Sequence, residues 1–431
     1  MEIAKNFVGR EYCMHQTITE KIIARHARRE YVRPGEFVEV SVDQTWSDDL
    51  GSPITLGLLK SNRVPRVFDA DRVFVTAMVN APAHSIETAA VMKDIRGLTS
   101  DFDITLYEAG QAGIHNALGI QLGRTLPGEL IVGGNSHACM AGALGCFATG
   151  MGSTDIAAIL ATGRTWLEVP RTIRYRYTGK LKKWVTGKDL ILHTIGLIGV
   201  AGADNCAMEF CGEPIEQLSV EERLSMTNMA IEAGAQNAII APDVKTFAYV
   251  EKIAKRPFEP IYGDPGADVF QEIEINVDRL EPVISVPFLP SKTTSISQLG
   301  EVKLDQVYIG SCTNGWITDL RCAASILKGR KVADGLRVFV IPSTTQIYKQ
   351  AIDEGLAQIF IEAGCALSMP TCGPCIGAQM GVLADGERCL STSNRNFPGR
   401  QGHVRSETYL CNPAVAAASA IKGFICGPDD L

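Results

Sequence analysis

The sequence predicts an α/β protein in which parallel strands alternate with helices. In the last third of the chain, apolar segments of strand length alternate with longer helical segments, a pattern typical of a parallel sheet. Earlier, a strand expected at 129–132 leads into a glycine-rich loop at 133–137, and sites of such sheets usually lie in loops of this kind. The length of 431 residues exceeds one ordinary core and favours two or three domains.

The first two thirds of the chain supply most of the expected strands. Residues 36–43 place Val38, Val40 and Val42 on one face, which predicts a strand. Ser153 or Thr154 is expected to cap a helix. Residues 142–152 are dense in small side chains, which predicts close packing and matches no nucleotide-binding fingerprint. Further strands are expected at 72–79, 103–107, 171–177 and 237–240, and helices at 153–161, 188–198, 219–233 (opened by a capping box) and 243–254.

The last third places its chemically active side chains at strand ends. A linker is expected at 287–294, so we set a domain boundary near Val286. Strands are expected at 306–309, 336–341 and 388–393, and helices up to 327, at 345–362 and at 413–422. Cys312 follows the first of these strands, and an arginine-containing loop follows the third. Ligands in such sheets lie at the carboxyl ends of the strands.

Composition and charge exclude several classes of function. The net charge is −7, so a nucleic-acid partner is not expected. No apolar run is long enough for a membrane span, and the N-terminus lacks the apolar core of a secretion signal. The 13 cysteines form no repeating framework, which favours the reducing cytoplasm. Ten of them are expected to be small buried hydrophobic residues: Cys13, Cys139, Cys146, Cys206, Cys211, Cys322, Cys365, Cys389, Cys411 and Cys426.

Three other cysteines form a candidate metal site. Cys372 and Cys375 flank Gly373-Pro374, a turn that lets two thiolates converge, and Cys312 lies in Gly-Ser-Cys-Thr-Asn-Gly. Zinc usually takes four protein ligands, and a redox pair would leave Cys312 unexplained. Three thiolates suit an iron–sulfur cluster with one iron open to a substrate oxygen. The pattern favours the cluster and leaves zinc as an alternative.

Arg395 and Arg400 form a candidate anion site. They flank Asn-Phe-Pro-Gly and follow Ser-Thr-Ser-Asn, so polar and turn-forming residues surround both guanidinium groups. Arginine binds carboxylates in a bidentate manner. The alternative is a pair of ordinary surface arginines.

These motifs resemble those of the aconitase superfamily. The resemblance rests on Gly-Ser-Cys-Thr-Asn, Cys-Gly-Pro-Cys-Ile-Gly and Ser-Asn-Arg-Asn-Phe-x-Gly-Arg, and it covers nearly the whole chain. Residues 133–155, 218–235 and 381–400 are similar to the large subunits of two-subunit members, the type of isopropylmalate isomerase, homoaconitase and dimethylmalate dehydratase.

The resemblance implies three αβα domains around a cluster cleft, without the swivelling fourth domain of the family. We expect the domains at 1–170, 171–286 and 287–431. The resemblance also implies a 4Fe–4S cluster with one iron not ligated by protein. The implied residues are Cys312, Cys372 and Cys375 as cluster ligands, Ser136, Asn394, Arg395 and Arg400 as substrate-binding residues, and His115, His137, Glu209 and Asn135 as catalytic residues.

The implied activity is that of a hydro-lyase, a dehydratase or isomerase. It would act on a small hydroxy-dicarboxylic acid such as an alkylmalate, with the open iron as Lewis acid. The implied partner is a small swivelling-domain subunit that carries a serine base, in a cytoplasmic heterodimer.

The sequence departs from the family at two places. Relatives have an Asp-His pair where this chain has Met78 and Val79, neither of which transfers a proton; nearby His84 is a possible substitute. The family's Asp-Ser-His reads Asn135-Ser136-His137, and an amide is not a base. The lost pair motivates an alternative: a non-catalytic cluster-binding or regulatory paralogue. A zinc-stabilised structural protein is a third reading.

Overall fold

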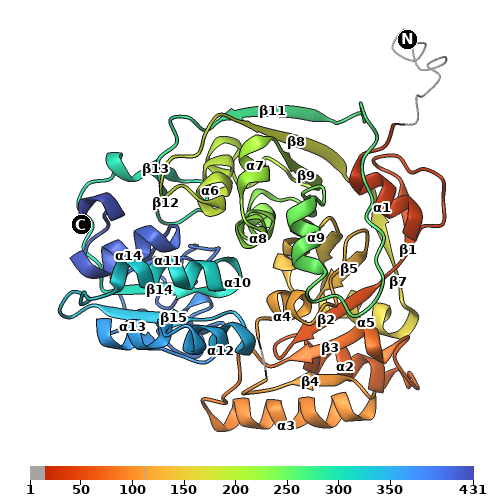
Figure 1. The fold of residues 1–431 in the computed structure, drawn as a ribbon. Coiled ribbons are helices and arrows are strands. Elements are labelled where there is room, and N and C mark those ends of the chain that lie inside the picture. Colours follow the sequence, from red (N-terminus) through yellow and green to blue (C-terminus); the bar gives the residue numbers. More distant parts are fainter. Residues whose placement is uncertain (1–14, 112) are drawn as a thin grey trace.

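Three larger sheets organise the chain (Figure 1). The computed structural model describes residues 15–111 and 113–431. Cys13 lies outside the described residues; of the other nine cysteines expected to be buried, Cys211 and Cys322 are half-buried and the rest are buried. The α/β fold class predicted from the sequence is confirmed.

The first sheet is parallel, with strand order β4-β3-β2-β5-β6. A separate antiparallel ribbon pairs β1 (Phe37–Ser41) with β7 (Arg164–Glu168) and buries the three valines expected on one face. The other strands are β2 (Gln44–Asp48), β3 (Val73–Thr76), β4 (Thr105–Tyr107), β5 (Leu130–Gly133) and β6 (Phe147–Gly150). The helices are α1 (Ile18–His26), α2 (Ser52–Ser61), α3 (Ile86–Asp101), α4 (His115–Gln121), α5 (Ser153–Thr162) and the 3-10 segments η1 (Ala70–Arg72) and η2 (Ser136–Leu144).

The second sheet is also parallel, with order β10-β9-β8-β11. Its strands are β8 (Arg171–Thr178), β9 (Cys206–Cys211), β10 (Asn237–Ile239) and β11 (Gln271–Asn276). Its helices are α6 (Gly187–Ile198), α7 (Glu213–Gln217), α8 (Val220–Asn228), η3 (Met229–Ala233) and α9 (Val244–Val250). The predicted capping box is present, because Ser219 and Glu222 satisfy each other's backbone N–H groups at the start of α8.

The third sheet is mixed, with order β13-β12-β18-β17-β14-β15-β16. The predicted boundary at 286 falls between β12 and β13, which pair within this sheet. Its strands are β12 (Val283–Ser285), β13 (Thr293–Ser295), β14 (Gln306–Gly310), β15 (Arg337–Ile341), β16 (Ala366–Leu367), β17 (Arg388–Ser391) and β18 (Glu407–Leu410). Its helices are α10 (Ser311–Asn314), α11 (Ile317–Leu327), α12 (Thr345–Asp353), α13 (Leu356–Ala363), α14 (Pro413–Lys422) and η4 (Ile296–Gln298), η5 (Gly373–Cys375) and η6 (Pro428–Asp430).

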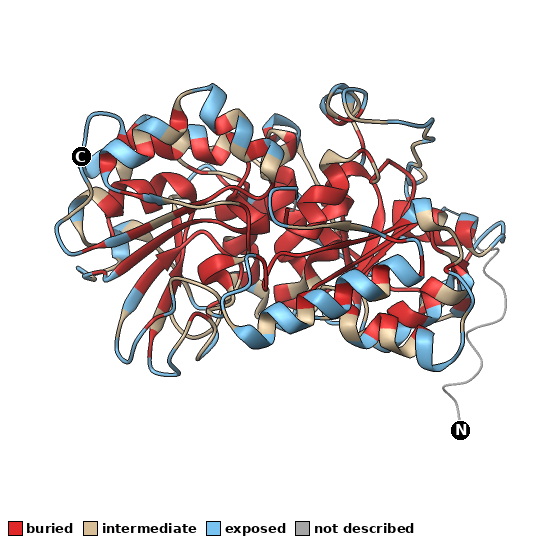
Figure 2. Ribbon diagram, turned by 90° about the horizontal axis from the view of Figure 1, so that it is seen from below, coloured by how far each residue is buried: buried red, intermediate tan, exposed pale blue. Residues whose placement is uncertain are grey.

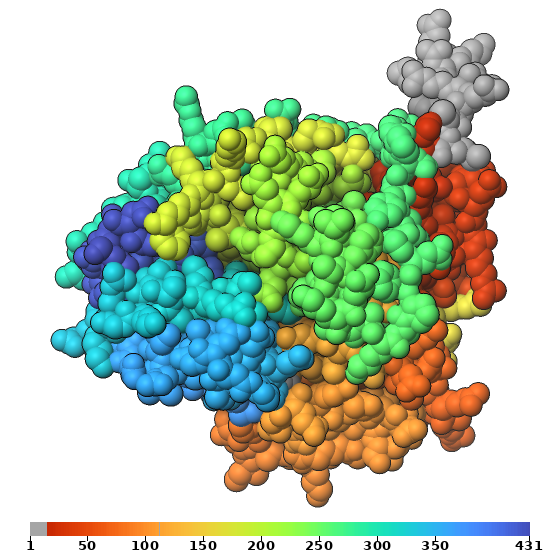
Figure 3. Space-filling view, viewed as in Figure 1, coloured from red at the N-terminus to blue at the C-terminus, as the bar shows by residue number. Residues whose placement is uncertain are grey.

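We call each of the three larger sheets, together with its helices, the first, second and third region. Helix α8 of the second region contacts the other two. It lies centrally in Figure 1 and packs against η2 of the first region and α10 of the third. Strands and inner helix faces are buried, whereas outer helix faces are exposed (Figure 2). In the space-filling view, the orange residues of the first region abut the blue residues of the third (Figure 3). The carboxyl ends of β5 and β14 therefore reach a common interior.

Two predicted elements differ in detail. Gly152, not Ser153 or Thr154, is the N-cap of α5, and no side chain caps that helix. The helical region 345–362 is two helices, α12 and α13, because Gly355 between them adopts a left-handed conformation with φ of 74°. In the described residues, every helix is too short or too polar to cross a membrane.

The close packing predicted for 142–152 generates a stability prediction. A Cβ at Gly142 would overlap the carbonyl oxygen of Ala238, so Gly142→Ala should lower the free energy of unfolding by roughly 1–3 kcal/mol. Gly57→Ala is the matched control, because its Cβ meets open space within α2, and it should raise stability by up to about 1 kcal/mol. Urea unfolding measures both, and equal stability of the two variants would contradict the packing.

Candidate active site

Three buried or half-buried thiols gather around the carboxyl end of β14. Cys312 lies in α10, directly after the strand, and Cys375 ends η5. The Ser311 hydroxyl oxygen is 3.8 Å from the Cys312 sulfur and 3.9 Å from the Cys375 sulfur. Cys372 is held by its backbone N–H, which donates to the Met78 carbonyl at 2.8 Å. All three cysteines are free of disulfides.

Hydrogen-bond donors surround these sulfurs. The side-chain amides of Asn228 and Asn394 lie 3.1 Å and 3.5 Å from the Cys312 sulfur, and Arg400 Nη2 lies 3.8 Å from the Cys375 sulfur. Donors of this kind stabilise thiolates and the sulfurs of iron–sulfur clusters. A neutral thiol is a weak hydrogen-bond acceptor and gains little from such donors. The surroundings of the sulfurs therefore fit metal-bound thiolates.

The electrostatics of the thiols also fit a metal cluster. Burial, and then Cys375 and Cys312, raise the pKa of Cys372 well above its usual value. Coordination to a metal removes the thiol proton. Among the described residues, no three His, Cys, Asp or Glu side chains are grouped as the ligands of a single metal ion. A cluster of several irons is larger than one ion, so its thiolates need not meet at one point.

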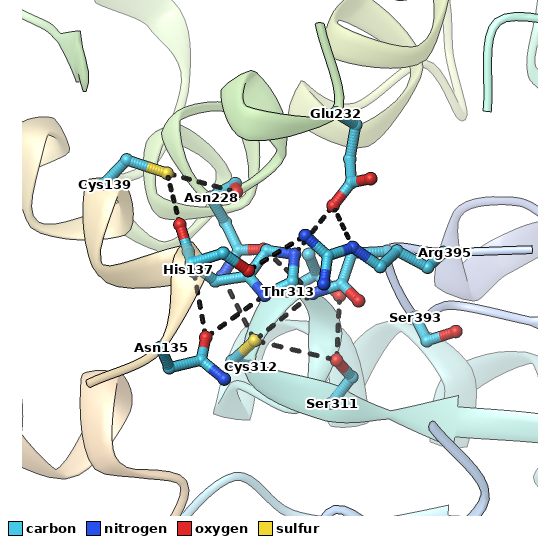
Figure 4. A network of polar contacts seen from close by, with 12 residues as sticks. Asn135, His137, Cys139, Asn228, Glu232, Ser311, Cys312, Thr313, Ser393 and Arg395 are labelled. Atoms are coloured by element: carbon cyan, nitrogen blue, oxygen red, sulfur yellow. Dashed lines mark hydrogen bonds and ion pairs between the residues drawn. The ribbon is translucent and has the colours of Figure 1, made fainter. Parts of the chain in front are cut away.

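A buried network of charges adjoins the thiols (Figure 4). His137 Nε2 is 2.8 Å from a Glu232 carboxylate oxygen, and Arg395 Nε donates to the same oxygen at 2.7 Å. Arg395 Nη2 also donates to the Ser136 hydroxyl at 2.9 Å. The network thus connects η2, η3 and the loop after β17. Of the sequence-predicted residues, it brings together Ser136, His137 and Arg395.

Asn135 orients the neighbouring imidazole. Its side-chain oxygen accepts the His137 backbone N–H at 2.9 Å and lies 3.3 Å from His137 Nδ1. Because this oxygen only accepts, it favours the tautomer with the proton on Nδ1. Burial lowers the pKa of His137 to about 4, although Glu232 opposes this shift.

His115 faces the substituted position Met78. Its Nδ1 lies 3.0 Å from the Met78 sulfur, where the family's aspartate is expected. A thioether is a weak acceptor and cannot balance an imidazolium. Burial accordingly lowers the pKa of His115 to about 3. Within the described residues, His115 Nε2 has no hydrogen-bond partner.

The loop that contains Met78 is tied to neighbouring strands. The Asp49 carboxylate, after β2, accepts the backbone N–H groups of Met78, Val79 and Asn80. Thr371 donates its hydroxyl to the Met78 carbonyl at 2.7 Å. The substitution of the Asp-His pair therefore leaves an ordered loop beside Cys372. His84, the possible substitute, is exposed.

Glu209 lies apart from this group. It sits on β9, where Arg174 Nε donates to its carboxylate at 2.7 Å. The carboxylate in the network is instead Glu232, which the sequence analysis missed. Asn228 ends α8, and Glu232 lies in η3, which follows it directly. A glutamate within the otherwise apolar run 229–235 was the available signal.

Two other supporting residues, Lys188 and Asn228, were missed by the sequence analysis. Lys188, on α6, is fully buried and donates to the carbonyls of Thr392 and Ser393 at 3.0 and 2.6 Å. Asn394 Nδ2 donates to the side-chain oxygen of Asn228 at 3.1 Å. Both contacts hold the loop that leads to Arg395.

Comparison with known proteins identifies the family. The profile of the aconitase family (aconitate hydratase) matches residues 20–301 and 297–423. The chain belongs to the aconitase family. The 3-isopropylmalate dehydratase large subunit of Halothermothrix orenii is 51% identical over 419 residues, covering 97% of this chain and 100% of that protein. The corresponding subunit of Aquifex aeolicus is 48% identical over 423 residues, covering 97% and 98%.

A solved structure has the same fold. Aconitase X of Thermococcus kodakaraensis, in its holo-form, aligns with a TM-score of 0.51 over 85% of this chain and 88% of that chain, at 12% identity. The predicted family and enzyme class are confirmed: the chain is an iron–sulfur hydro-lyase of the dehydratase large-subunit type. Membership of this family implies a 4Fe–4S cluster.

Burial of His115 predicts a pH dependence of stability. The unfolded histidine titrates near 6.5 and the folded one near 3, so the unfolded state binds more protons between these values. Stability is therefore full above pH 6.5 and falls as the pH is lowered towards 3. In His115→Gln, urea unfolding at pH 7 and pH 5 should show a smaller loss of stability than in the wild type. Equal losses in both proteins would contradict a neutral, buried His115.

Proposed function

We propose that this chain is the cluster-bearing subunit of a two-subunit dehydratase that acts on a small hydroxy-dicarboxylate such as an alkylmalate. The observation that carries the proposal is the placement of Cys312, Cys372 and Cys375 beside two arginines. The 3-isopropylmalate dehydratase large subunits support the substrate class and a small-subunit partner. We further propose three domains, with limits near 170 and between β11 and β12, because a limit at 286 would separate β12 from its own sheet. We also propose a cytoplasmic heterodimer.

Cys312, Cys372 and Cys375 would hold the 4Fe–4S cluster, with one iron not ligated by protein. When bound, the cluster supplies a Lewis acid for a substrate oxygen. Asn228, Asn394 and Arg400 stabilise the thiolates through the contacts described above.

The two arginines bind the carboxylates of the substrate. Arg400 is half-buried, and its buried Nε has no hydrogen-bond partner within the described residues. A buried unpaired donor is costly, so a substrate carboxylate is the natural acceptor. Glu232 and Ser136 orient Arg395, which leaves Nη1 of its guanidinium for the ligand.

Glu232 and His137 are placed to pass a proton to the departing hydroxyl. They share a hydrogen bond of 2.8 Å, and both side chains are buried. Met78 and Val79 cannot transfer a proton, and Asn135 serves to orient His137. The base that takes the carbon-bound proton is the serine expected on the small subunit.

A second candidate is a non-catalytic, cluster-binding or regulatory paralogue. The contact between His115 and the Met78 sulfur favours it, because that histidine has lost the carboxylate expected in relatives. This candidate predicts a loaded cluster without turnover of any dicarboxylate, even with the small subunit present.

Paired glutamate variants test the assignment. With the small subunit present, a panel of alkylmalates should first identify a substrate. Glu232→Gln should then lower kcat by roughly 10²–10⁴-fold, because it removes an acid–base group. Glu209→Gln is the matched control, because its carboxylate pairs with Arg174 away from the thiols, and it should stay within a few-fold of wild type.

The reverse pattern, with activity lost in Glu209→Gln and kept in Glu232→Gln, would contradict the proposed roles. A wild-type protein that holds its cluster but turns over no dicarboxylate would favour the paralogue.

A further inference from the structure

Lys188 is a fully buried cation that the proposed mechanism does not use. It lies in the first turn of α6, and its ammonium donates to the Thr392 carbonyl at 3.0 Å and the Ser393 carbonyl at 2.6 Å. Burial lowers the pKa of Lys188 to about 8. An ammonium removed from water is costly unless an anion compensates it.

No carboxylate among the described residues makes an ion pair with Lys188. The adjacent Asp189 carboxylate is occupied by the Val283 N–H at 2.8 Å and by Asn412 at 2.9 Å. Asp319 is the acidic residue whose charge would favour the ammonium form of Lys188. Burial raises the pKa of Asp319 to about 8, so its carboxyl group is largely protonated and neutral at neutral pH. The amide of Asn314 and the backbone N–H of Trp316 already bind that carboxyl group.

The other neighbours of Lys188 are thiols. The Thr392 carbonyl that binds the ammonium also accepts the Thr313 hydroxyl at 2.9 Å, and Thr313 directly follows Cys312. Cys411, Cys312 and Cys375 favour the charged form of Lys188. Cys411 is fully buried, and burial raises the pKa of its thiol well above the usual value, so it stays neutral. Cys312 and Cys375 are the thiols that a bound cluster would convert to thiolates.

We propose that Lys188 is the counter-charge of the cluster thiolates and a positioning residue for Arg395. The inference rests on the cluster of the proposed function. The carbonyls that bind Lys188 immediately precede Asn394 and Arg395. The ammonium therefore couples the charge of the cluster to the loop that presents the substrate-binding arginine.

Substitution of Lys188 separates charge from loop support. Lys188→Gln keeps amide donors but removes the charge. Thr313→Val is the matched control. It removes another hydrogen bond to the Thr392 carbonyl, of 2.9 Å, and a bond of 3.3 Å to the Ser311 hydroxyl, without changing charge. The readouts are the midpoint potential of the cluster, followed by electron paramagnetic resonance, and the rate of iron loss to a chelator.

In Lys188→Gln, the midpoint potential should become more negative, because reduction adds negative charge near a site that has lost a positive one. Iron loss should accelerate by roughly tenfold, the usual effect of removing a residue that supports metal ligands. Thr313→Val should keep the wild-type potential. Lys188→Arg keeps the positive charge and should also keep the wild-type potential. If Lys188→Gln does not fold, Lys188→Arg is the variant compared with Thr313→Val.

The outcomes separate this inference from the proposed function. A wild-type protein without iron and sulfide would overturn the proposed function and this inference together. A cluster-loaded Lys188→Gln protein with unchanged potential and iron loss would overturn the counter-charge alone. A shift in Lys188→Arg or Thr313→Val as large as that in Lys188→Gln would also overturn it, because loop support would then be the cause.

Discussion

The burial of three thiols at the carboxyl end of β14 is the constraint on which the rest of the site depends. Burial, and then the neighbouring thiols, raise the pKa of Cys372. Amides of Asn228 and Asn394 and the guanidinium of Arg400 point at the sulfurs. These donors come from the second and third regions, so the site forms only when α8 packs against both η2 and α10.

This chain departs from the family pattern at Met78 and Asn135, and the two departures affect the two site histidines differently. His115 faces a thioether and stays neutral, because burial lowers the pKa of its imidazole. His137 keeps a carboxylate partner in Glu232, while Asn135 orients its ring. The proposed proton transfer is therefore assigned to the His137–Glu232 pair. The Met78 loop is retained as a structural support, through Asp49 and Thr371.

Periodicity and motifs predicted most of the fold, because strands here alternate with helices in short, regular units. Motif spacing likewise predicted which residues gather at the site, including Ser136, His137 and Arg395. The glutamate was predicted at Glu209 and lies in the network at Glu232, because a buried carboxylate gives no local signal without its distant partners. Lys188 was missed for the same reason: its partners are carbonyls more than two hundred positions away.

The central claim is that Cys312, Cys372 and Cys375 hold an iron–sulfur cluster with one open iron. The most direct measurement is analysis of iron, sulfide and zinc in anaerobically purified protein, with the electron paramagnetic resonance spectrum after mild oxidation. The account predicts the signal of a three-iron cluster, converted back to a four-iron cluster by added ferrous ion. Stoichiometric zinc without sulfide would contradict it.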